Sequence, residues 1–197
     1  MDWLERLDRA LKGAVSEAKE VGRNSVIAFS GGLDSSLLAV LLPDLPLYSV
    51  AVEGSEDEFW VVKAAEMIGR DVNLVRAEVS EDIVVSVMNI IESMNPLDVS
   101  LALPLYILGE RVASDGYEYV ITGQGADELF GGYEKYRTCC NKDELMRSDF
   151  ENVVEYGIHR DRRAVGVWGC KLIAPYLHPD VVNVALSIPT ELKVSKD

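Results

Sequence analysis

The fold of this chain is decided by residues 25–36, which read SVIAFSGGLDSS. Residues 25–29 are a mostly apolar run with the length of a buried strand. Residues 30–32, Ser-Gly-Gly, break that strand, and residues 33–42 repeat apolar side chains at helical spacing as far as Pro43. A buried strand that turns into a helix in this way is typical of a parallel sheet.

The same alternation continues along the chain. Further strands are predicted at residues 47–52, 72–75 and 119–121, and residues 171–173 are the candidate for a fifth strand. Helices are predicted at residues 1–21, 56–68, 81–94, 101–114 and 180–187. The strands are near-continuous apolar runs, which indicates burial on both faces. We therefore predict a single α/β domain over residues 1–197, with a Rossmann-like parallel sheet of about five strands flanked by helices.

Composition and charge exclude several classes of protein. The chain has 197 residues, of which 19 are Lys or Arg and 33 are Asp or Glu, so its formal charge is −14. Binding to nucleic acid or to anionic lipid draws on cationic surface, so we expect neither partner. Apolar runs are shorter than the roughly 18 residues that span a bilayer, and residues 1–6 lack the pattern of a signal peptide. Three cysteines without metal-ligand spacing complete the expectation of a reduced, cytoplasmic protein.

The loop after the first strand has the composition of a phosphate-binding turn. In a doubly wound sheet, ligands bind beyond the carboxyl ends of the strands, where the strand order switches. Two glycines allow a tight turn, and the helix N-terminus that follows offers N–H groups beside the hydroxyls of Ser35 and Ser36. An aspartate beside phosphate is unfavourable without a cation, so Asp34 predicts Mg²⁺. The alternative is an ordinary turn in which Ser30 caps the helix and Asp34 complements its dipole.

A second loop of similar composition follows the fourth predicted strand. Residues 122–128 read TGQGADE, with glycines at the strand end and acids immediately after them. Asp127 could complete a two-carboxylate Mg²⁺ site with Asp34. The alternative makes Asp127 and Glu128 favourable charges at a helix N-terminus. Residues 131–133, Gly-Gly-Tyr, are interpreted as a tight turn that serves packing.

Three segments together resemble one enzyme family. Residues 30–36 resemble the SGGxDS pyrophosphate loop of the ATP pyrophosphatases, which GMP synthetase, NAD synthetase and several tRNA-modifying enzymes share. Residues 125–133, GADELFGGY, resemble the more specific GxDExFGGY block of the asparagine synthetase branch. Residues 174–177 and 180–189 resemble that family's VPFLD and ALSLP segments. Over residues 24–193 the chain is therefore similar to the ATP pyrophosphatase domain of the asparagine synthetase family, which has an adenine nucleotide alpha hydrolase-like fold.

The resemblance implies a ligase of amino-acid biosynthesis that uses ATP and Mg²⁺. In the family, a substrate carboxylate attacks the α-phosphate of ATP, pyrophosphate leaves, and ammonia displaces AMP to form an amide. Carried over, the catalytic residues are Asp34, Gln124 and Asp127, and the two aspartates hold the metal. The nucleotide-binding residues implied are Phe29, Ser30, Gly31, Gly32, Asp34, Ser35, Ser36, Val52, Thr122 and Gly123. Among them the Ser-Gly loop holds pyrophosphate, whereas Phe29, Val52, Thr122 and Gly123 line the adenosine.

The chain departs from the family pattern at positions that concern the acceptor substrate. Gln124 stands where the family has a glutamate that supports adenylation. Lys171 and Ile173 stand at the family's acid and base. These differences put aspartate in doubt as the acceptor, so the expected substrate is a small-molecule carboxylate whose identity stays open.

Two further departures concern the nitrogen source and a lysine. Position 2 is Asp, where the family's glutaminase domain begins with a Cys nucleophile, so we expect free ammonia or a separate glutaminase subunit as the source of nitrogen. The family also has a lysine beyond the ALSLP helix. Lys193 and Lys196 lie too close to Pro189 to be taken as its replacements, so either this sequence stops before that lysine or the protein lacks it. The chain is interpreted as a stand-alone, diverged member of the family, and assembly into a homo-oligomer stays open.

Two other functions remain open. A tRNA-modifying adenylating enzyme would use the same first loop, but the charge of −14 and the lack of paired redox cysteines disfavour it. A non-catalytic module that binds a nucleotide or a partner fits the glutamine at position 124 and the missing lysine. Pyrophosphate release with a panel of carboxylates separates the enzyme from the non-catalytic module.

Overall fold

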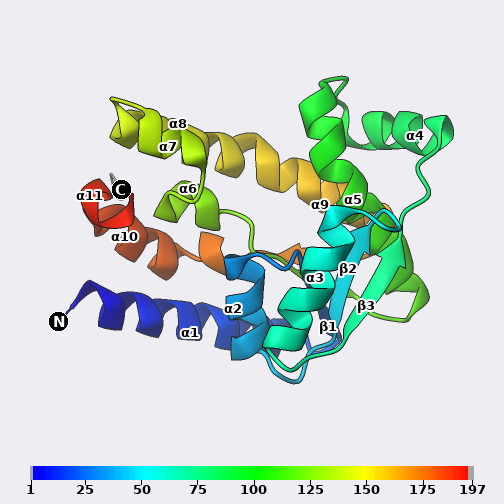
Figure 1. Cartoon of the computed structure of the whole chain (residues 1–197), viewed down its shortest axis with the longest axis horizontal. Helices are drawn as coiled ribbons and strands as arrows, with labels where there is room; N and C mark the ends of the chain where they lie inside the picture. Colours follow the sequence, from blue (N-terminus) through cyan, green and yellow to red (C-terminus); the bar gives the residue numbers. More distant parts are fainter. Residues whose placement is uncertain (1, 195–197) are drawn as a thin grey trace.

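Five parallel strands form the centre of the molecule in the computed structural model, which describes residues 2–194 (Figure 1). The strands are β1 (Ser25–Ala28), β2 (Leu47–Ala51), β3 (Val72–Arg76), β4 (Tyr119–Ile121) and β5 (Lys171–Ile173). Their order in the sheet is β3-β2-β1-β4-β5, and every neighbouring pair is parallel. The predicted α/β fold with a five-stranded parallel sheet is confirmed, and the fifth strand lies at the predicted residues.

The strand order reverses between β1 and β4. β1 lies between β2 and β4, with Ile27 opposite Leu47 on one side and opposite Ile121 on the other. Because the strands are parallel, the loops that follow β1 and β4 leave neighbouring strands at the same edge of the sheet. This is the position at which open α/β sheets bind their ligands.

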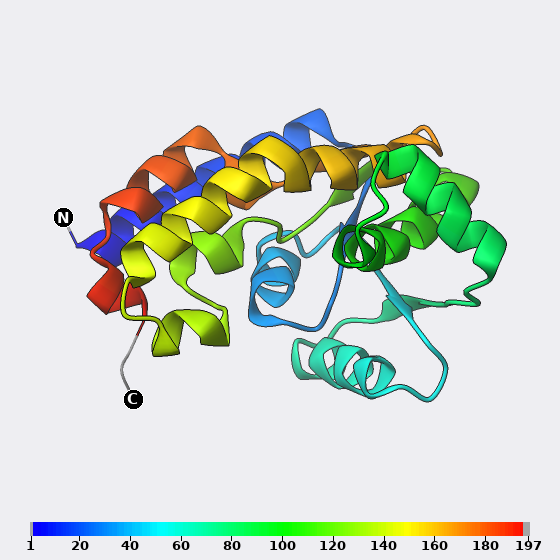
Figure 2. The ribbon, with the colours of Figure 1, turned by 90° about the horizontal axis from the view of Figure 1, so that it is seen from above.

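Helices cover both faces of the sheet. Figure 2 shows α2 and α3 on one side of it and α4 and α5 on the other. The helices are α1 (Trp3–Val21), α2 (Leu33–Leu41), α3 (Glu56–Met67), α4 (Glu81–Ile91), α5 (Pro96–Ser114), α6 (Ala126–Phe130), α7 (Glu134–Thr138), α8 (Lys142–Asn152), α9 (Ile158–Gly166), α10 (Pro179–Ser187) and α11 (Thr190–Lys193). A π-helical turn (Val153–Gly157) joins α8 to α9, and a 3₁₀ turn (Pro175–Leu177) precedes α10.

Successive strand residues enter different cores, which explains the apolar runs of the sequence. Ile27 packs with Leu38 of α2, whereas its neighbour Val26 packs with Val112 of α5 and Val165 of α9. Ile27 and Val26 are both completely buried. Full burial of such a side chain contributes about 1.5–3 kcal/mol. Both faces of the central strands therefore stabilise the fold.

Several helix boundaries differ from the predicted ones for local reasons. α5 begins at Pro96 instead of residue 101, because a proline fits the first turn of a helix and Asn95 accepts a hydrogen bond from the N–H of Leu97 (3.0 Å). α4 ends at Ile91 instead of residue 94, because Glu92 adopts a positive φ of 55°. Strand and helix order are unaffected by these differences.

Residues 142–166 form one long helical rod. α8, the π-helical turn and α9 succeed one another without a break, and Figure 2 shows them as the yellow to orange helix. α9 packs on α5 and β5, so the rod is anchored to the sheet at its far end. Within residues 2–194, we find no helix that combines the length and the apolarity needed to cross a membrane.

Candidate active site

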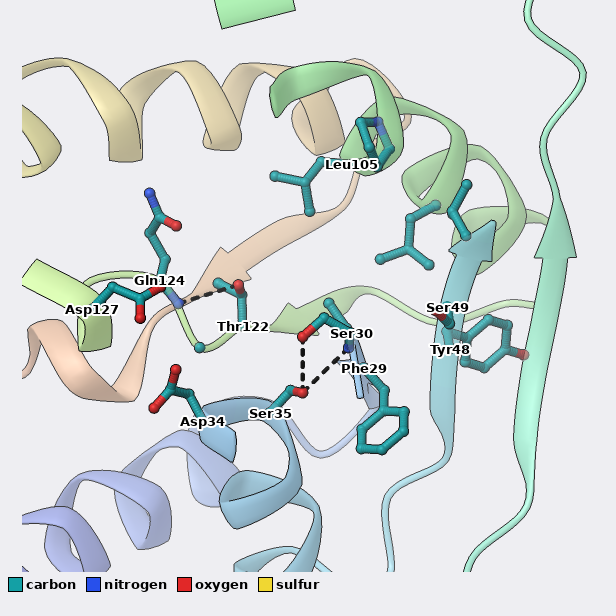
Figure 3. Close-up of a pocket in the computed structure, with 15 residues that line it drawn as sticks. Phe29, Ser30, Asp34, Ser35, Tyr48, Ser49, Leu105, Thr122, Gln124 and Asp127 are labelled. Carbon is teal, nitrogen blue, oxygen red and sulfur yellow. Dashed lines mark hydrogen bonds between the residues drawn. The ribbon is translucent and has the colours of Figure 1, made fainter. Parts of the chain in front are cut away.

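A cavity of about 300 Å³ opens at the carboxyl ends of β1, β2 and β4 (Figure 3). Its walls come from the loop after β1, from β2, from the middle of α5 and from the loop after β4. The lining residues are Ala28, Phe29, Ser30, Asp34, Ser35, Tyr48, Ser49, Val50, Pro104, Leu105, Leu108, Thr122, Gly123, Gln124 and Asp127. The two loops singled out in the sequence therefore meet at one cavity.

The loop after β1 is built by local hydrogen bonds. The Oγ of Ser35 accepts a hydrogen bond from the backbone N–H of Ser30 (3.2 Å), and the two serine hydroxyls lie 3.1 Å apart. Gly31 has a φ of +77°, and a methyl group placed there would lie 3.1 Å from the Cα of Val61. Only glycine combines that backbone conformation with so close an approach to α3.

The N-terminus of α2 has no side-chain cap. Its N-cap residue is Gly32, so the alternative in which Ser30 caps the helix is wrong. Ser30 instead accepts a long hydrogen bond from the N–H of Gly32 (3.4 Å), one residue before the helix begins. The first N–H groups of a helix carry a partial positive charge and lack partners within the helix. This end of α2, with the serine hydroxyls beside it, is suited to an anion.

Two carboxylates lie at one side of the cavity. Asp34 is at the start of α2 and Asp127 in the first turn of α6, and Figure 3 shows their carboxyl groups on the same side. Burial raises the pKa of both carboxyl groups, and the charge of Asp127 raises the pKa of Asp34 further. The cavity lining that residues 2–194 provide contains no Lys, Arg or His to offset these charges.

The donor set fits a hard divalent cation that also binds phosphate. Mg²⁺ is commonly held by one or two carboxylates together with substrate phosphates and water. In the described part of the chain, no cluster of three or more His, Cys, Asp or Glu residues could hold a metal unaided. Asp34 and Asp127 can therefore hold Mg²⁺ only as part of a shell that a ligand or water completes.

Glycines lie directly beside both candidate metal ligands, Asp34 and Asp127. A methyl group placed at Gly132 would overlap Oδ1 of Asp127, and one placed at Gly123 would lie 3.2 Å from the Cβ of Asp34. The turn at residues 131–133 was interpreted as packing alone, yet Gly132 borders the candidate metal ligand directly. The sequence indicates this contact only through the pair Gly131 and Gly132, four and five residues after Asp127.

Glu128, which follows Asp127, is a buried carboxyl group. It is 7% exposed and accepts a hydrogen bond from the hydroxyl of Tyr133 (2.7 Å). Burial raises the pKa of Glu128, and its charge contributes to the raised pKa of Asp34. Asp127 and Glu128 do lie in the first turn of α6, as the alternative interpretation expected, but the surroundings of Glu128 are those of a buried group.

Most of the predicted nucleotide-binding residues line the cavity. These are Phe29, Ser30, Asp34, Ser35, Thr122 and Gly123, together with the predicted catalytic residues Gln124 and Asp127. Gly31, Gly32 and Ser36 shape the loop and the first turn of α2 without lining the cavity. Val52 does not line it either: β2 ends at Ala51, and Val52 is 57% exposed. Val50 lines the wall assigned to Val52.

Other lining residues were missed. Tyr48, Ser49 and Val50 belong to the strand beside the switch point, and that position in the order was the only signal for them. The α5 residues Pro104, Leu105 and Leu108 carry no local signal, because only the packing of α5 on the sheet brings them to the cavity.

The positions expected to alter acceptor contacts lie elsewhere. Lys171 begins β5, and its Nζ lies 5.5 Å from the centre of the Tyr119 ring. Ile173 packs against the core that includes α1. Neither residue lines the cavity. Lys193 lies in α11 beside a different hollow, and Lys196 lies outside the described residues.

Comparison with known proteins places this arrangement in context. A family model described as asparagine synthase matches residues 5–144. A putative glutamine-hydrolyzing asparagine synthetase of Methanocaldococcus jannaschii is 35% identical over 98% of this chain and 38% of its own length. A glutamine-hydrolyzing asparagine synthetase of Sandersonia aurantiaca is 28% identical over 86% of the chain and 36% of its own length. One of Arabidopsis thaliana is 27% identical over 95% of the chain and 35% of its own length. The chain thus spans little more than a third of the length of these curated relatives.

Proposed function

The chain belongs to the asparagine synthase family, and from this premise we propose that it is an Mg²⁺-dependent ATP pyrophosphatase that adenylates a carboxylate for amide formation. One observation carries the proposal. Asp34 and Asp127 are half-buried carboxylates in a cavity whose described lining is free of basic residues, and they lie beside an uncapped helix N-terminus. Such a site is suited to a metal-bound polyphosphate.

The phosphate end of the cavity is the loop of residues 30–35. Ser30 and Ser35 have hydroxyls 3.1 Å apart and would donate hydrogen bonds to the pyrophosphate, as would the first N–H groups of α2. Gly31 and Gly32 let the backbone take this path, and Ser36 lies in the same first turn. Asp34 and Asp127 would hold Mg²⁺, a cation that would supply charge to offset that of the leaving group.

The nucleoside end is apolar. Val50, Leu105 and Leu108 line it, and Ser49 adds a hydroxyl. Phe29 borders it with its backbone, because its ring is buried in the core beside α2. Thr122 and Gly123 close the cavity opposite β2. A purine fits such a slot, because its rings gain from apolar contact while backbone groups at the strand ends take up its polar edge.

The acceptor end is marked by Gln124. In the proposed reaction, an oxygen of the acceptor carboxylate attacks the α-phosphate of ATP, the bond to pyrophosphate breaks, and an acyl-adenylate forms. Ammonia then attacks the acyl carbon, and AMP leaves with the former carboxylate oxygen. The amide of Gln124 could donate a hydrogen bond to an oxyanion, but it lacks the charge with which a glutamate would bind an ammonium group. We therefore propose a carboxylate other than aspartate as the preferred acceptor.

The nitrogen source follows from the cysteines. Relatives of this chain are named as glutamine-hydrolyzing, which requires a nucleophile for glutamine. Cys139, Cys140 and Cys170 do not line the cavity, and Cys170 is buried beside β5. We propose that the described domain takes ammonia, either free or delivered by a glutaminase subunit. The proposed compartment is the cytoplasm.

A non-catalytic nucleotide-binding module is the second candidate, because Gln124 replaces a charged group next to the reacting atoms. Pyrophosphate release from Mg²⁺-ATP, measured with acetate, succinate, aspartate and glutamate in the presence of ammonia, decides between the two. We expect carboxylate-dependent release. Mg²⁺-ATP binding by calorimetry without any release would support the module instead, and failure of both would contradict the nucleotide site altogether.

A further inference from the structure

The π-helical turn between α8 and α9 lies directly behind Gln124. The N–H of Ile158 donates its hydrogen bond to the carbonyl of Val153, five residues earlier instead of four. Such single π turns insert one extra residue into a helix and occur frequently at functional sites. Here the insertion falls where the rod passes the loop after β4.

The extra residue decides which position of the rod faces that loop. Ile158, Ala164 and Val165 of α9 are buried toward the sheet and α5, and this orientation is set by packing. One residue before α9 begins, the buried Gly157 faces the loop. A methyl group placed on Gly157 would lie 3.5 Å from Nε2 of Gln124 and 3.7 Å from Cβ of Val153. Such a methyl group would make ordinary van der Waals contact with the Gln124 amide, so glycine leaves the space directly behind the amide open.

Packing alone holds the Gln124 side chain. Its backbone N–H donates to the hydroxyl of Thr122 (3.4 Å), but its amide group has no hydrogen-bond partner among residues 2–194. Figure 3 shows the side chain rising from the loop, away from Asp34 and Ser35 and toward the helices above the cavity. Because no hydrogen bond fixes the amide, the surface behind it determines how far it withdraws from the cavity.

We propose that Gly157 is a positioning residue that sets acceptor specificity through Gln124, an inference that rests on the proposed function. With glycine at position 157, the space behind the amide stays open, and the amide can withdraw toward the π turn when an acceptor carboxylate with a side chain of its own binds. A methyl group at that position would meet the amide at van der Waals distance (3.5 Å) and leave it no room to withdraw. The phosphate end, which has no contact with Gly157, keeps its geometry.

Gly157→Ala tests this proposal, and Gly166→Ala is its matched control. Gly157 has helical dihedral angles (φ −56°, ψ −52°), so alanine is compatible with the backbone. Gly166 lies in α9 of the same rod, and a methyl group placed there has nothing within 4 Å. The two variants therefore share the effect of alanine on helix propensity and differ in contact with Gln124.

The first readout is the side-chain amide signal of Gln124 in a ¹⁵N NMR spectrum of the full chain, assigned by its loss in Gln124→Ala. We expect Gly157→Ala to shift this signal and Gly166→Ala to leave it in place. The second readout is pyrophosphate release with acetate, succinate, aspartate and glutamate. Gly157→Ala should lower kcat/KM for the larger acceptors relative to acetate by about tenfold, because an amide that cannot withdraw keeps a larger acceptor from its productive position.

Two comparisons show whether Gly157 acts through Gln124. In the Gln124→Ala background, Gly157→Ala should no longer change acceptor preference, and the affinity for Mg²⁺-ATP should change less than twofold throughout. An unshifted Gln124 signal in Gly157→Ala, or an equal loss in both backgrounds, would overturn the proposal. If the wild type releases no pyrophosphate with any acceptor, the proposed function fails, and the amide signal alone decides whether Gly157 positions Gln124.

Discussion

The two ends of the cavity are built in different ways. The phosphate end is one continuous segment, residues 30–35, held by hydrogen bonds between residues that are two to five positions apart. The acceptor end is assembled from Gln124, on the loop after β4, and Gly157, on the π-helical turn. A local segment keeps its geometry when its surroundings change, whereas an assembled wall depends on every element that supplies it. We therefore expect nucleotide binding to be robust in this chain and acceptor choice to be easily altered.

The largest effect is expected from the two aspartates that join the ends. Asp34→Asn and Asp127→Asn should each weaken Mg²⁺-ATP binding by about a hundredfold, because each removes a ligand charge that only a cation makes favourable. Both variants should fold, since an amide in place of a desolvated carboxylate relieves repulsion. Calorimetric titration with Mg²⁺-ATP measures the loss.

Asp57→Asn is the matched control for these variants. Asp57 is likewise an acid in the first turn of a helix, but it is exposed on α3 and outside the cavity. Its affinity should equal that of the wild type. Wild-type affinity in both Asp34→Asn and Asp127→Asn would contradict the two-carboxylate site.

A smaller effect is expected from a substitution at Gly132, which lies against the candidate metal ligand Asp127. A methyl group at Gly132 would overlap Oδ1 of Asp127, so Gly132→Ala should displace that carboxylate and weaken Mg²⁺-ATP binding by about tenfold. Gly13→Ala, in an exposed part of α1 with nothing within 4 Å, is the control. Equal affinities for the two variants would mean that the position of Asp127 does not depend on the turn at residues 131–133.

The hydrogen bond that Tyr133 donates to the buried Glu128 should matter for stability. Among the described residues, the Tyr133 hydroxyl is the only side-chain group that donates a hydrogen bond to Glu128. Tyr133→Phe removes this donor, and we expect a loss of about 1–3 kcal/mol in the free energy of unfolding. Urea denaturation measures it. Tyr156→Phe is the control, because Tyr156 is 68% exposed on the π turn. A loss that persists undiminished in a Glu128→Leu background, which has no acceptor at this position, would show that the hydroxyl acts elsewhere.

The smallest effect is on the pH dependence of the metal-free protein. Burial raises the pKa of Asp34, Asp127 and Glu128 above their unfolded values. At pH values between the unfolded pKa values, near 4, and the higher folded ones, the native state binds more protons than the unfolded state. The free energy of unfolding therefore rises as the pH falls toward 4, and this stabilisation is lost as the pH rises through the folded pKa values.

Thermal unfolding between pH 7 and pH 5 checks this sign. The Tm of the metal-free wild type should rise on acidification by a few degrees relative to the Asp34→Asn/Asp127→Asn double variant, since about 2–4 °C corresponds to 1 kcal/mol in a chain of this size. Saturating Mg²⁺-ATP should reduce the difference. A Tm that falls more steeply in the wild type than in the double variant would indicate a basic partner for these acids.

Local rules were enough for the sheet and for the phosphate end. The run at residues 25–29 predicts a strand because both of its faces are buried, and the glycines, serines and Asp34 act within one turn. Charge, turn conformation and helix polarity are properties of neighbouring residues, so they could be predicted without the rest of the molecule. The same reasoning located Asp127, an acid in the first turn of the helix that comes after β4, whereas Gln124 was singled out only by the resemblance to the family motif.

Tertiary structure alone decided the remaining walls. Val50 lines the cavity in place of Val52 because β2 ends at Ala51, and the strand end depends on pairing with β1 and β3. Leu105 reaches the cavity only because α5 packs across the sheet. Gly157 meets Gln124 because a π turn resets the rod above the loop. Contacts between residues far apart in the chain depend on how whole elements pack, and a local pattern carries no record of that packing.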